Sequence, residues 1–491
     1  MKDIFVDSQI TIRQIDEYVW EVLQQGEMRV PGRIYTGKTG IRELAKEVAG
    51  GKAWNALRQI VNVACLPGIQ SASLAMADVH PGYGFPIGGV GAFSLDEGVV
   101  SVAGVGYDIN CGVRTLRTPL HRDEVEDNQD DLANILYHTV PAGLGSAGDI
   151  HLTIAEMDKL LVQGAEWVMR RGYGVAGDLD YVEEGGRIMG ADPKMVSSKA
   201  KERELKQIGS LGSGNHYLEV QWVETVFDPQ AADVFGLFPG QVLISIHSGS
   251  RALGHQIGSD YLKTLDAASR KYGIPIRERE LVCAPFDSPE GRDYLAAVRC
   301  GINVAFANRQ ALAHLAREAF QAALGIRPDR ITTLYEVAHN TAKVETHTVD
   351  GQQQELIVHR KGATRAFGPG RPELPEAYRE VGQPVLVGGT MGTSSYILRG
   401  TQKAMDETFG SALHGAGRVM SRRQASKLFR ADKLTRRLAG QGIVVRGHSR
   451  RGLAQEAPGA YKDVDQVVDI MHEAGIIRKV ARLRPLICIK G

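Results

Sequence analysis

The amino-acid sequence predicts an α+β fold in a single large domain that spans residues 1–491. Helical and strand-like patterns are mixed without the regular strand–helix alternation that is typical of a doubly wound sheet. The chain shows no internal repeat and no linker rich in proline or serine. Its candidate functional motifs extend from residue 78 to residue 490, and one catalytic domain is the simplest arrangement that holds them all.

The composition excludes several classes of protein. Hydrophobic residues make up 43% of the chain and charged residues 23%, which provides a core and argues against wholesale disorder. The five cysteines are scattered and include no CxxC pair, which argues against a disulfide framework. The chain has no long apolar run and a polar N-terminus, so we expect a cytoplasmic protein without membrane association. Because the net charge is only +1, a nucleic acid would have to bind to a local basic patch.

The predicted elements begin with a peripheral segment over residues 1–65, which is expected to be helical, most clearly over 40–65. The glycine-rich stretch 69–115 has a strand-like pattern. Thr153 and Glu156 form a capping-box pattern, which predicts a helix that ends near Arg171.

Four further segments follow. Residues 180–208 are charged and expected to be exposed, and residues 242–250 predict a buried strand that runs into a polar turn. Apolar spacing over 292–324 predicts a long helix. A helix near 464–474 is expected to stop at Gly475.

The stretch GRIYTGKT, residues 32–39, matches the phosphate-loop pattern. The pattern requires a buried strand before it, whereas the preceding QGEMRVP is short, charged and ends in proline. No later strand ending in aspartate stands out as a magnesium ligand. The sequence therefore favours an ordinary surface turn over a nucleotide site at Lys38.

A thiol, a carboxylate and several histidines indicate a metal site. Asp108 and Cys111 lie three residues apart in YDINCGVR, while His216, His247 and His339 each stand beside small or amide residues. These ligand types suit a divalent transition metal, and two close ions are a known device for phosphoryl chemistry. The alternative is a set of hydrogen-bonded core histidines and one buried cysteine, which is the commoner fate of such residues.

His414 lies in a different setting, SALHGAGRVMSRR. Its small neighbours leave room for a ligand, and the arginines that follow can neutralise phosphate. Such a histidine suits a nucleophile for a nucleotidyl group, and the alternative is a tight contact between two helices.

The stretch over residues 420–437 holds seven basic residues and one acid, Asp432. A solvated helical face is the usual reason for a run of charge, but here the interleaved acids are missing. The stretch therefore predicts binding of a polyanion.

These motifs, in this order and spacing, resemble those of the RtcB family of RNA ligases. The stretches that carry the resemblance are DVHPGYGFPIGGV, GYDINCGVR, GSGNHYLEVQ, IHSGSR, VAHNTAKVE, HRKGATRAFGPG, GTMGTSSY and HGAGRVMSR. The resemblance implies an α+β domain with mixed β-sheets around a deep central pocket and helices packed outside. It also implies a ligase, dependent on GTP and two Mn²⁺ ions, that joins RNA 2′,3′-cyclic phosphate or 3′-phosphate ends to 5′-hydroxyl ends. The reaction would serve tRNA splicing or RNA repair and pass through a histidine–GMP intermediate and a guanylylated RNA 3′-end.

The resemblance also assigns roles to individual residues. His414 would take up GMP, and Asp78 would be an essential acid near the metals. The metal ligands would be Asp108, Cys111, His216, His247 and His339, with the cysteine bridging both ions. The nucleotide contacts would be Asn215, Glu219, Asn340, Gly388, Thr390, Met391, Ser395, Gly415, Ala416, Gly417, Tyr461 and Lys490. RNA phosphates would meet Arg251, Lys361, Arg418 and Arg422.

One departure from the family pattern is visible in VGGTMG, where Gly388 and Thr390 replace a proline and a serine. A threonine hydroxyl can replace that of serine, so only local loop rigidity is in question. Zinc could occupy the same ligands, and an archease-type accessory protein is a possible partner. The rival readings are a metal-dependent phosphatase or nuclease and a non-catalytic RNA-binding protein.

Overall fold

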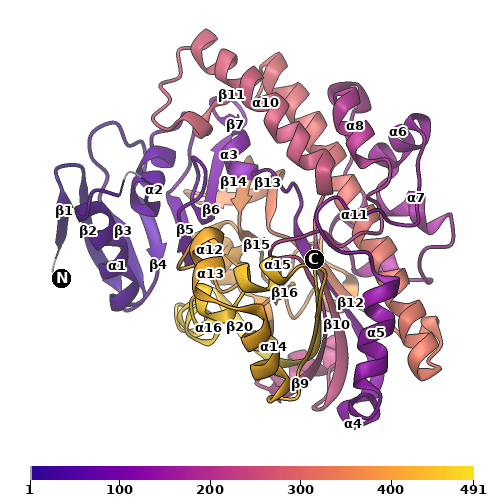
Figure 1. The fold of residues 1–491 in the computed structure, drawn as a ribbon. Coiled ribbons are helices and arrows are strands. Elements are labelled where there is room, and N and C mark those ends of the chain that lie inside the picture. The colour runs from indigo at the N-terminus through magenta and orange to yellow at the C-terminus, as the bar shows by residue number, and fades with distance from the viewer. Residues whose placement is uncertain (1–2, 53) are drawn as a thin grey trace.

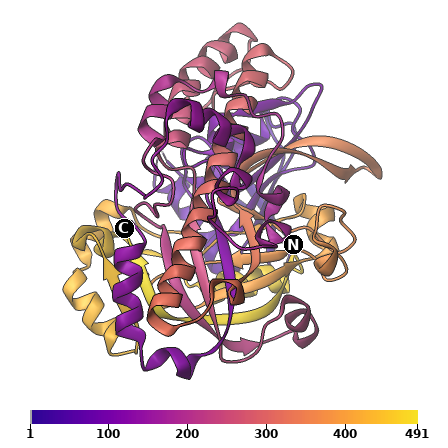
Figure 2. The same cartoon turned by 90° about the vertical axis from the view of Figure 1, so that its right-hand side faces the viewer.

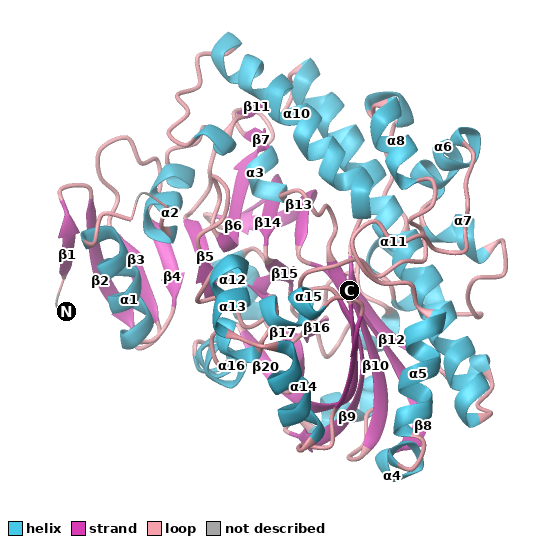
Figure 3. Cartoon of the chain, in the orientation of Figure 1, coloured by secondary structure: helices cyan, strands magenta, loops and turns pink. Residues whose placement is uncertain are grey.

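The computed structural model describes residues 3–52 and 54–491, and it confirms the predicted α+β fold (Figures 1 and 3). Two large sheets carry most of the strands. The first runs in the order β1-β2-β3-β4-β5-β6-β14-β13 and is antiparallel except for the pair β4 and β5. Its strands are β1 (Ile4–Asp7), β2 (Ile10–Asp16), β3 (Val19–Val22), β4 (Gly32–Tyr35), β5 (Ser73–His80), β6 (Ile87–Ser94), β13 (Asn340–Val349) and β14 (Gln352–Lys361).

The second sheet runs in the order β12-β8-β10-β9-β20-β17-β16, with β19 pairing in parallel with β20. Two short two-stranded sheets complete the β-structure. The strands are β8 (Gly112–His121), β9 (Tyr217–Val226), β10 (Gln241–Ser248), β12 (Thr332–Ala338), β16 (Pro384–Val387), β17 (Ser395–Gly400), β19 (Val444–Gly447) and β20 (Ile477–Lys490), with the pairs β7 (Val99–Ser101) and β11 (Cys283–Pro285), and β15 (Ala363–Arg365) and β18 (Ser411–Leu413).

The expectation of a helical segment over residues 1–65 was wrong for its first half. Strands β1 to β4 occupy residues 4–35, and only α1 (Lys38–Ala49) and α2 (Ala56–Ala64) are helical. Ile10 and Ile12 alternate with more exposed residues, and they pack in one cluster with residues of α1 and α2. This period of two is the pattern of a half-buried strand.

These elements also decide whether residues 32–39 form a phosphate loop. Gly32 to Tyr35 form β4, which is mostly buried, and Lys38 begins α1. Half of the motif is therefore strand, so that neither a phosphate-cradling loop nor the expected surface turn is present in residues 32–35.

Helix α11 (Pro289–Leu324) confirms the predicted long helix and is buried along most of its length. It packs with α5 (Gln129–Thr139) against the second sheet, as Figure 2 shows, and with α10 (Arg251–Lys271). The remaining helices are α3 (Val102–Val105), α4 (Arg122–Glu126), α6 (Ile154–Gln163), α7 (Ala165–Met169), α8 (Ser198–Glu204), α9 (Pro229–Phe235), α12 (Gln402–Thr408), α13 (Arg422–Leu428), α14 (Ala431–Ala439), α15 (Arg450–Gln455) and α16 (Val464–Glu473).

Most of the other predicted elements are present, with two corrections. The capping box at Thr153 is formed, but the helix breaks at Gly164, which has a φ of +59°. A Cβ added at this position would lie only 2.4 Å from the Gly186 carbonyl oxygen, so that only glycine fits. The stretch 180–208 is not wholly exposed, because Glu183 is buried in ion pairs with Lys343 and Arg365. The strand β10 and the helix α16 lie where they were predicted.

None of the helices in the described part of the chain combines the length and the apolar character that crossing a bilayer would need.

A buried ion pair makes a testable contribution to this fold. Arg317 of α11 donates to both carboxylate oxygens of Asp178, which also accepts hydrogen bonds from Thr333 and Gln310. We expect Asp178→Asn to lower the free energy of unfolding by about 3–5 kcal/mol at pH 7, because it leaves the Arg317 charge buried without its counter-ion. Urea denaturation would measure the loss, with the exposed Asp180→Asn as a control.

The same pair predicts a pH dependence. Burial by itself raises the pKa of Asp178, but the Arg317 and Arg114 guanidinium groups outweigh it and hold the pKa at about 2. Because this value lies below that of an unfolded aspartate, about 3.9, the contribution is present above pH 4 and is lost as pH falls toward 2. The stability difference between wild type and Asp178→Asn should narrow over that range, and a constant difference would contradict the assignment.

Candidate metal centre and adjacent histidine

Both large sheets contribute residues to one cleft with a volume of about 1710 Å³. Asn340 and Lys361 reach it from the first sheet, and Tyr217, His247 and Lys490 reach it from the second. The cleft therefore gathers side chains that are distant in the sequence.

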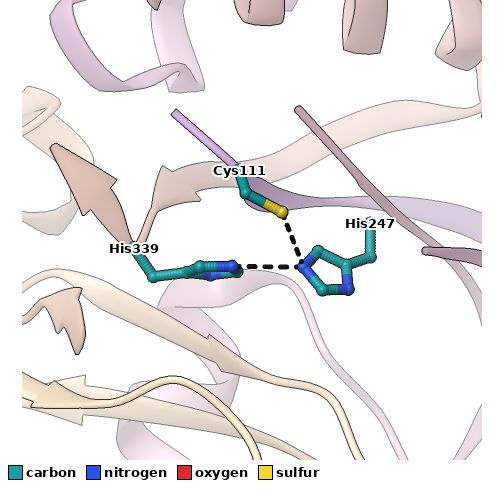
Figure 4. A group of neighbouring side chains, drawn as sticks. All are labelled: Cys111, His247 and His339. Atoms are coloured by element: carbon teal, nitrogen blue, oxygen red, sulfur yellow. Dashed lines mark hydrogen bonds between the residues drawn. The ribbon is translucent and has the colours of Figure 1, made fainter. Parts of the chain in front are cut away.

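Three of the predicted metal ligands meet on its floor (Figure 4). The Cys111 sulfur lies 3.2 Å from Nε2 of His247, and that nitrogen lies 3.2 Å from Nε2 of His339. The sheet register explains the contact. Cys111 directly precedes β8, which pairs with β10 on one side and β12 on the other, so the ends of all three strands lie together.

A second group shares the same sulfur. Nε2 of His216 lies 2.7 Å from an Asp108 carboxylate oxygen and 3.4 Å from the Cys111 sulfur. Cys111 therefore belongs to two sets of candidate ligands, one with His247 and His339 and one with Asp108 and His216. The structure brings together all five residues that the sequence predicted as ligands.

A hydrogen bond to the backbone holds the His247 ring in the orientation of a metal ligand. Its Nδ1 lies 3.2 Å from the backbone oxygen of Asn215, which can only accept, so Nδ1 carries the proton. The lone pair of Nε2 then faces Cys111 and His339. Burial lowers the pKa values of His247 and His339 well below the ordinary range, so that both rings are neutral. A neutral imidazole with its second nitrogen held by a carbonyl is the usual form of a metal ligand.

The charge states of the other ligands also fit a cation. Burial alone would raise the pKa of Asp108, but His216 outweighs it and holds the carboxylate in its ionised form. Burial, and then the neighbouring Asp108, raises the pKa of the Cys111 thiol well above its usual value. A divalent ion would reverse this last effect, because thiolate is the ligating form and metal binding displaces its proton. Imidazole nitrogen, sulfur and carboxylate together fit a divalent transition metal.

The side chains of Arg309 and Asn340 hold the backbone around these ligands in place. Arg309 of α11 donates to the backbone oxygens of Asn110 and Ser248 at 2.7 and 2.8 Å. The Asn340 amide donates to the Asp108 backbone oxygen at 3.0 Å and accepts from the Gly362 N–H at 2.8 Å. Asn340 was expected to contact the nucleotide, and in the structure both ends of its amide brace the backbone of the centre.

His414 lies beside the centre, with its ring centroid 4.9 Å from that of His339. One oxygen of the buried Asp78 carboxylate lies 2.6 Å from Nδ1 of His414 and also accepts from the backbone N–H groups of His414 and Gly415. Burial alone would raise the pKa of Asp78, but His414 outweighs it and lowers the pKa. The ionised carboxylate keeps the proton on Nδ1, so that Nε2 of His414 carries the free lone pair.

Three of the residues expected to read guanine, Glu219, Ser395 and Lys490, lie along β9, β17 and β20, whereas Tyr461 lies beside Arg418 and Glu456. Tyr217 and Lys490 are paired across β9 and β20 at the cleft, and Glu219 and Cys488 form the next pair on the same face. Gln221 links Glu219 to Ser395 through bonds of 2.7 and 2.9 Å from its amide nitrogen. Burial raises the pKa of Glu219 to about 6.

The glycine loops lie at the cleft. Gly388 pairs with Gly415 in a β-bridge, and Thr390 lines the cleft beside them. A Cβ on Gly417, whose φ is +75°, would lie 2.2 Å from the Asp78 backbone oxygen. Ala416 also lines the cleft, whereas Met391 lies in a hydrophobic cluster with Leu438, Ile443, Leu453 and Cys488.

Sequence reasoning missed Glu456, which organises one end of the cleft. This nearly buried carboxylate accepts from Arg418 at 3.0 Å, from Arg422 at 2.9 Å and from the Tyr461 hydroxyl. Arg418 also lies over the Tyr461 ring, 4.6 Å from its centroid. No spacing pattern distinguishes Glu456 in the sequence, because its partners are brought to it only by the fold.

The two other predicted phosphate contacts are both buried, but they differ in their access to the cleft. Lys361 lines the cleft and donates to the Tyr83 backbone oxygen at 2.8 Å, and burial lowers its pKa to about 7. Arg251 is buried beside Ser210, to whose hydroxyl it donates at 3.2 Å, and it lies outside the described residues that line the cleft.

The basic stretch forms α13 and α14 and the turn between them. Arg423 lines both the main cleft and a second cavity of about 550 Å³, which Lys427, Arg430, Arg450 and Arg451 also line. The predicted basic surface is thus continuous with the cleft.

The fold and the site define an α+β protein with a candidate metal centre and an oriented histidine in one cleft. The chain matches the RtcB family, described as tRNA-splicing ligase RtcB, over residues 59–491. The proteins named tRNA-splicing ligase RtcB from Thermococcus kodakarensis and Archaeoglobus fulgidus are each 50% identical to it, over 98% of this chain and 99% of theirs. That from Pyrococcus abyssi is 52% identical over 78% of this chain and 42% of its own length. The chain belongs to the RtcB family.

Proposed function

We propose that this protein is an RNA ligase that acts in tRNA splicing or RNA repair. It joins RNA 2′,3′-cyclic phosphate or 3′-phosphate ends to 5′-hydroxyl ends and depends on GTP and two Mn²⁺ ions. Membership of a family named for tRNA-splicing ligases supports the general activity. The observation that carries the mechanism is the hydrogen bond between Asp78 and Nδ1 of His414, next to the metal ligands. Because both sheets supply the cleft, we also propose that the chain acts as one catalytic domain.

His414 is the proposed nucleophile. Its Nε2 attacks the α-phosphorus of GTP, a nitrogen–phosphorus bond forms, and the bond to pyrophosphate breaks. Asp78 keeps the proton on Nδ1 and stabilises the positive charge that develops on the ring. The GMP group then passes to the RNA 3′-phosphate, and the 5′-hydroxyl displaces GMP to seal the strand.

Five residues would hold the metal ions: Asp108, Cys111, His216, His247 and His339. When bound, the ions would neutralise the phosphoryl oxygens and lower the pKa of a bound water. Arg418 and Arg422 both form ion pairs with the buried carboxylate of Glu456. The Arg422 side chain is still 51% exposed, so it can reach an RNA phosphate.

Incubation with α-labelled GTP and Mn²⁺, followed by a denaturing gel, tests this function. We expect an acid-labile, alkali-stable label on the wild type and on Lys38→Ala, and no label on His414→Ala. A metal-dependent phosphatase or nuclease, or a non-catalytic RNA-binding protein, would carry no such label. Absence of the label from the wild type under every metal condition would contradict the proposal.

Glu219 makes a prediction about base selectivity. Guanine offers N1–H and N2–H donors that a carboxylate accepts and adenine lacks, so Glu219→Gln should reduce the preference for GTP over ATP by about 10- to 100-fold. In the wild type, GTP affinity should fall as pH drops through about 6, because protonation removes the accepting charge. Calorimetry with GTP and ATP at several pH values checks both effects, and the pH dependence should be absent from Glu219→Gln.

A further inference from the structure

Three aromatic side chains that line the cleft form a connected row. The Trp54 and Tyr83 rings lie edge to face with centroids 4.8 Å apart, and Tyr83 and Tyr107 do the same at 6.3 Å. We call Trp54, Tyr83 and Tyr107 the aromatic ladder. Trp54 and Tyr83 are 47% and 51% exposed, so two large rings face solvent side by side within the cleft.

The ladder is held rigidly from behind. One carboxylate oxygen of Glu278 accepts from the Trp54 indole N–H at 2.9 Å and from the Gly84 N–H at 3.0 Å. The Lys361 ammonium donates to the Tyr83 backbone oxygen at 2.8 Å. The peptide unit that joins Tyr83 to Gly84 is thus tied to side chains from elsewhere in the chain, while the Tyr83 ring itself stays uncovered. Such preorganisation lowers the entropy that a ligand must overcome to stack on it.

The ladder leads from the surface to the metal centre. Tyr107 immediately precedes the candidate ligand Asp108, and its ring stacks on that of His255 with a centroid distance of 5.9 Å. A strand that lay along the three rings would therefore arrive at the residues that hold the metal.

The surroundings of the ladder carry charges of both signs. Glu278 and Glu280 lie near Lys361, and Glu280 and Arg279 lie near Tyr107. They offer no uniform charge to a phosphate backbone, whereas the face of an aromatic ring accepts any base. An exposed row of rings beside a phosphate-processing centre is the arrangement by which proteins bind unpaired nucleotides.

We propose that the aromatic ladder is a stacking platform for the unpaired bases next to the RNA end that enters the metal centre. The inference rests on the proposed function, because it takes RNA as the substrate. Stacking would be tolerant of base identity and would require a single-stranded end.

The test compares binding of a single-stranded RNA of about eight nucleotides that carries a 3′-phosphate. We expect Tyr83→Ala to weaken binding by about 5- to 150-fold, which is the range for loss of one stacked base, and Tyr83→Phe to bind like the wild type. The matched control is Phe238→Ala, which removes an aromatic ring that is 41% exposed and does not line the cleft.

Abasic RNA separates stacking from a structural effect. Removing the bases next to the 3′-end should weaken wild-type binding to the level of Tyr83→Ala, and should weaken Tyr83→Ala little further. The inference is overturned if Tyr83→Ala binds intact RNA normally, if it loses affinity for abasic RNA to the same degree, or if Phe238→Ala has an equal effect. Labelling of His414 by GTP, measured in parallel, reports separately on the proposed function, and it should be unchanged in Tyr83→Ala.

Discussion

Replacing Cys111 by serine is expected to remove the metal centre and to slow labelling of His414 by GTP about 1000-fold or more. The Cys111 sulfur is shared by both sets of candidate ligands, so its loss weakens the two together. A serine hydroxyl stays protonated and is a poor ligand for transition metals. Metal content after incubation with Mn²⁺ and gel filtration, together with the labelling rate, would measure the effect.

The thiol also predicts a proton release. Since burial holds the pKa of Cys111 well above its usual value, the thiol is protonated without metal and must lose its proton to bind one. Metal binding should therefore release a proton in the wild type and not in Cys111→Ser, which calorimetry in buffers of different ionisation enthalpy detects. Cys65→Ser, which changes a cysteine that belongs to neither set of candidate ligands, serves as the control. Full metal content and activity in Cys111→Ser would show that the shared-thiolate assignment is wrong.

Replacing Asp78 by asparagine is expected to slow labelling of His414 by about 100- to 10,000-fold while leaving metal content intact. Three N–H groups converge on one oxygen of this carboxylate, and asparagine cannot supply its negative charge. The ring would lose the partner that holds the proton on Nδ1 and stabilises the charge that develops during attack. The second oxygen is buried with no hydrogen-bond partner among the described residues, so the asparagine N–H₂ would also lack an acceptor there.

Metal content distinguishes this defect from misfolding. Asp78 is absent from both sets of metal ligands, so Asp78→Asn should bind metal as the wild type does. Labelling at the wild-type rate in Asp78→Asn would contradict the proposed role of the carboxylate.

Local patterns predicted the elements that depend on neighbouring residues. The long helix α11, the strand β10 and the stop of α16 at Gly475 follow from apolar spacing and from a glycine with φ of +78°. The N-terminal strands were not predicted, because the alternating pattern around Ile10 and Ile12 is short. The break at Gly164 was not predicted, because the requirement for glycine there includes the close approach of the Gly186 backbone, which the sequence does not show.

The sequence by itself indicated the candidate ligands, the proposed nucleophile and the family, because these depend on which residues occur and in what order. Only the tertiary structure decided that Asp78 orients His414, 336 residues away, and that Cys111 lies between two groups of ligands. It also placed Met391 in a core cluster and Arg251 out of the cleft. The physical reason is that such contacts depend on which strands pair and in which register, and pairing between distant segments leaves no periodic signal in the chain.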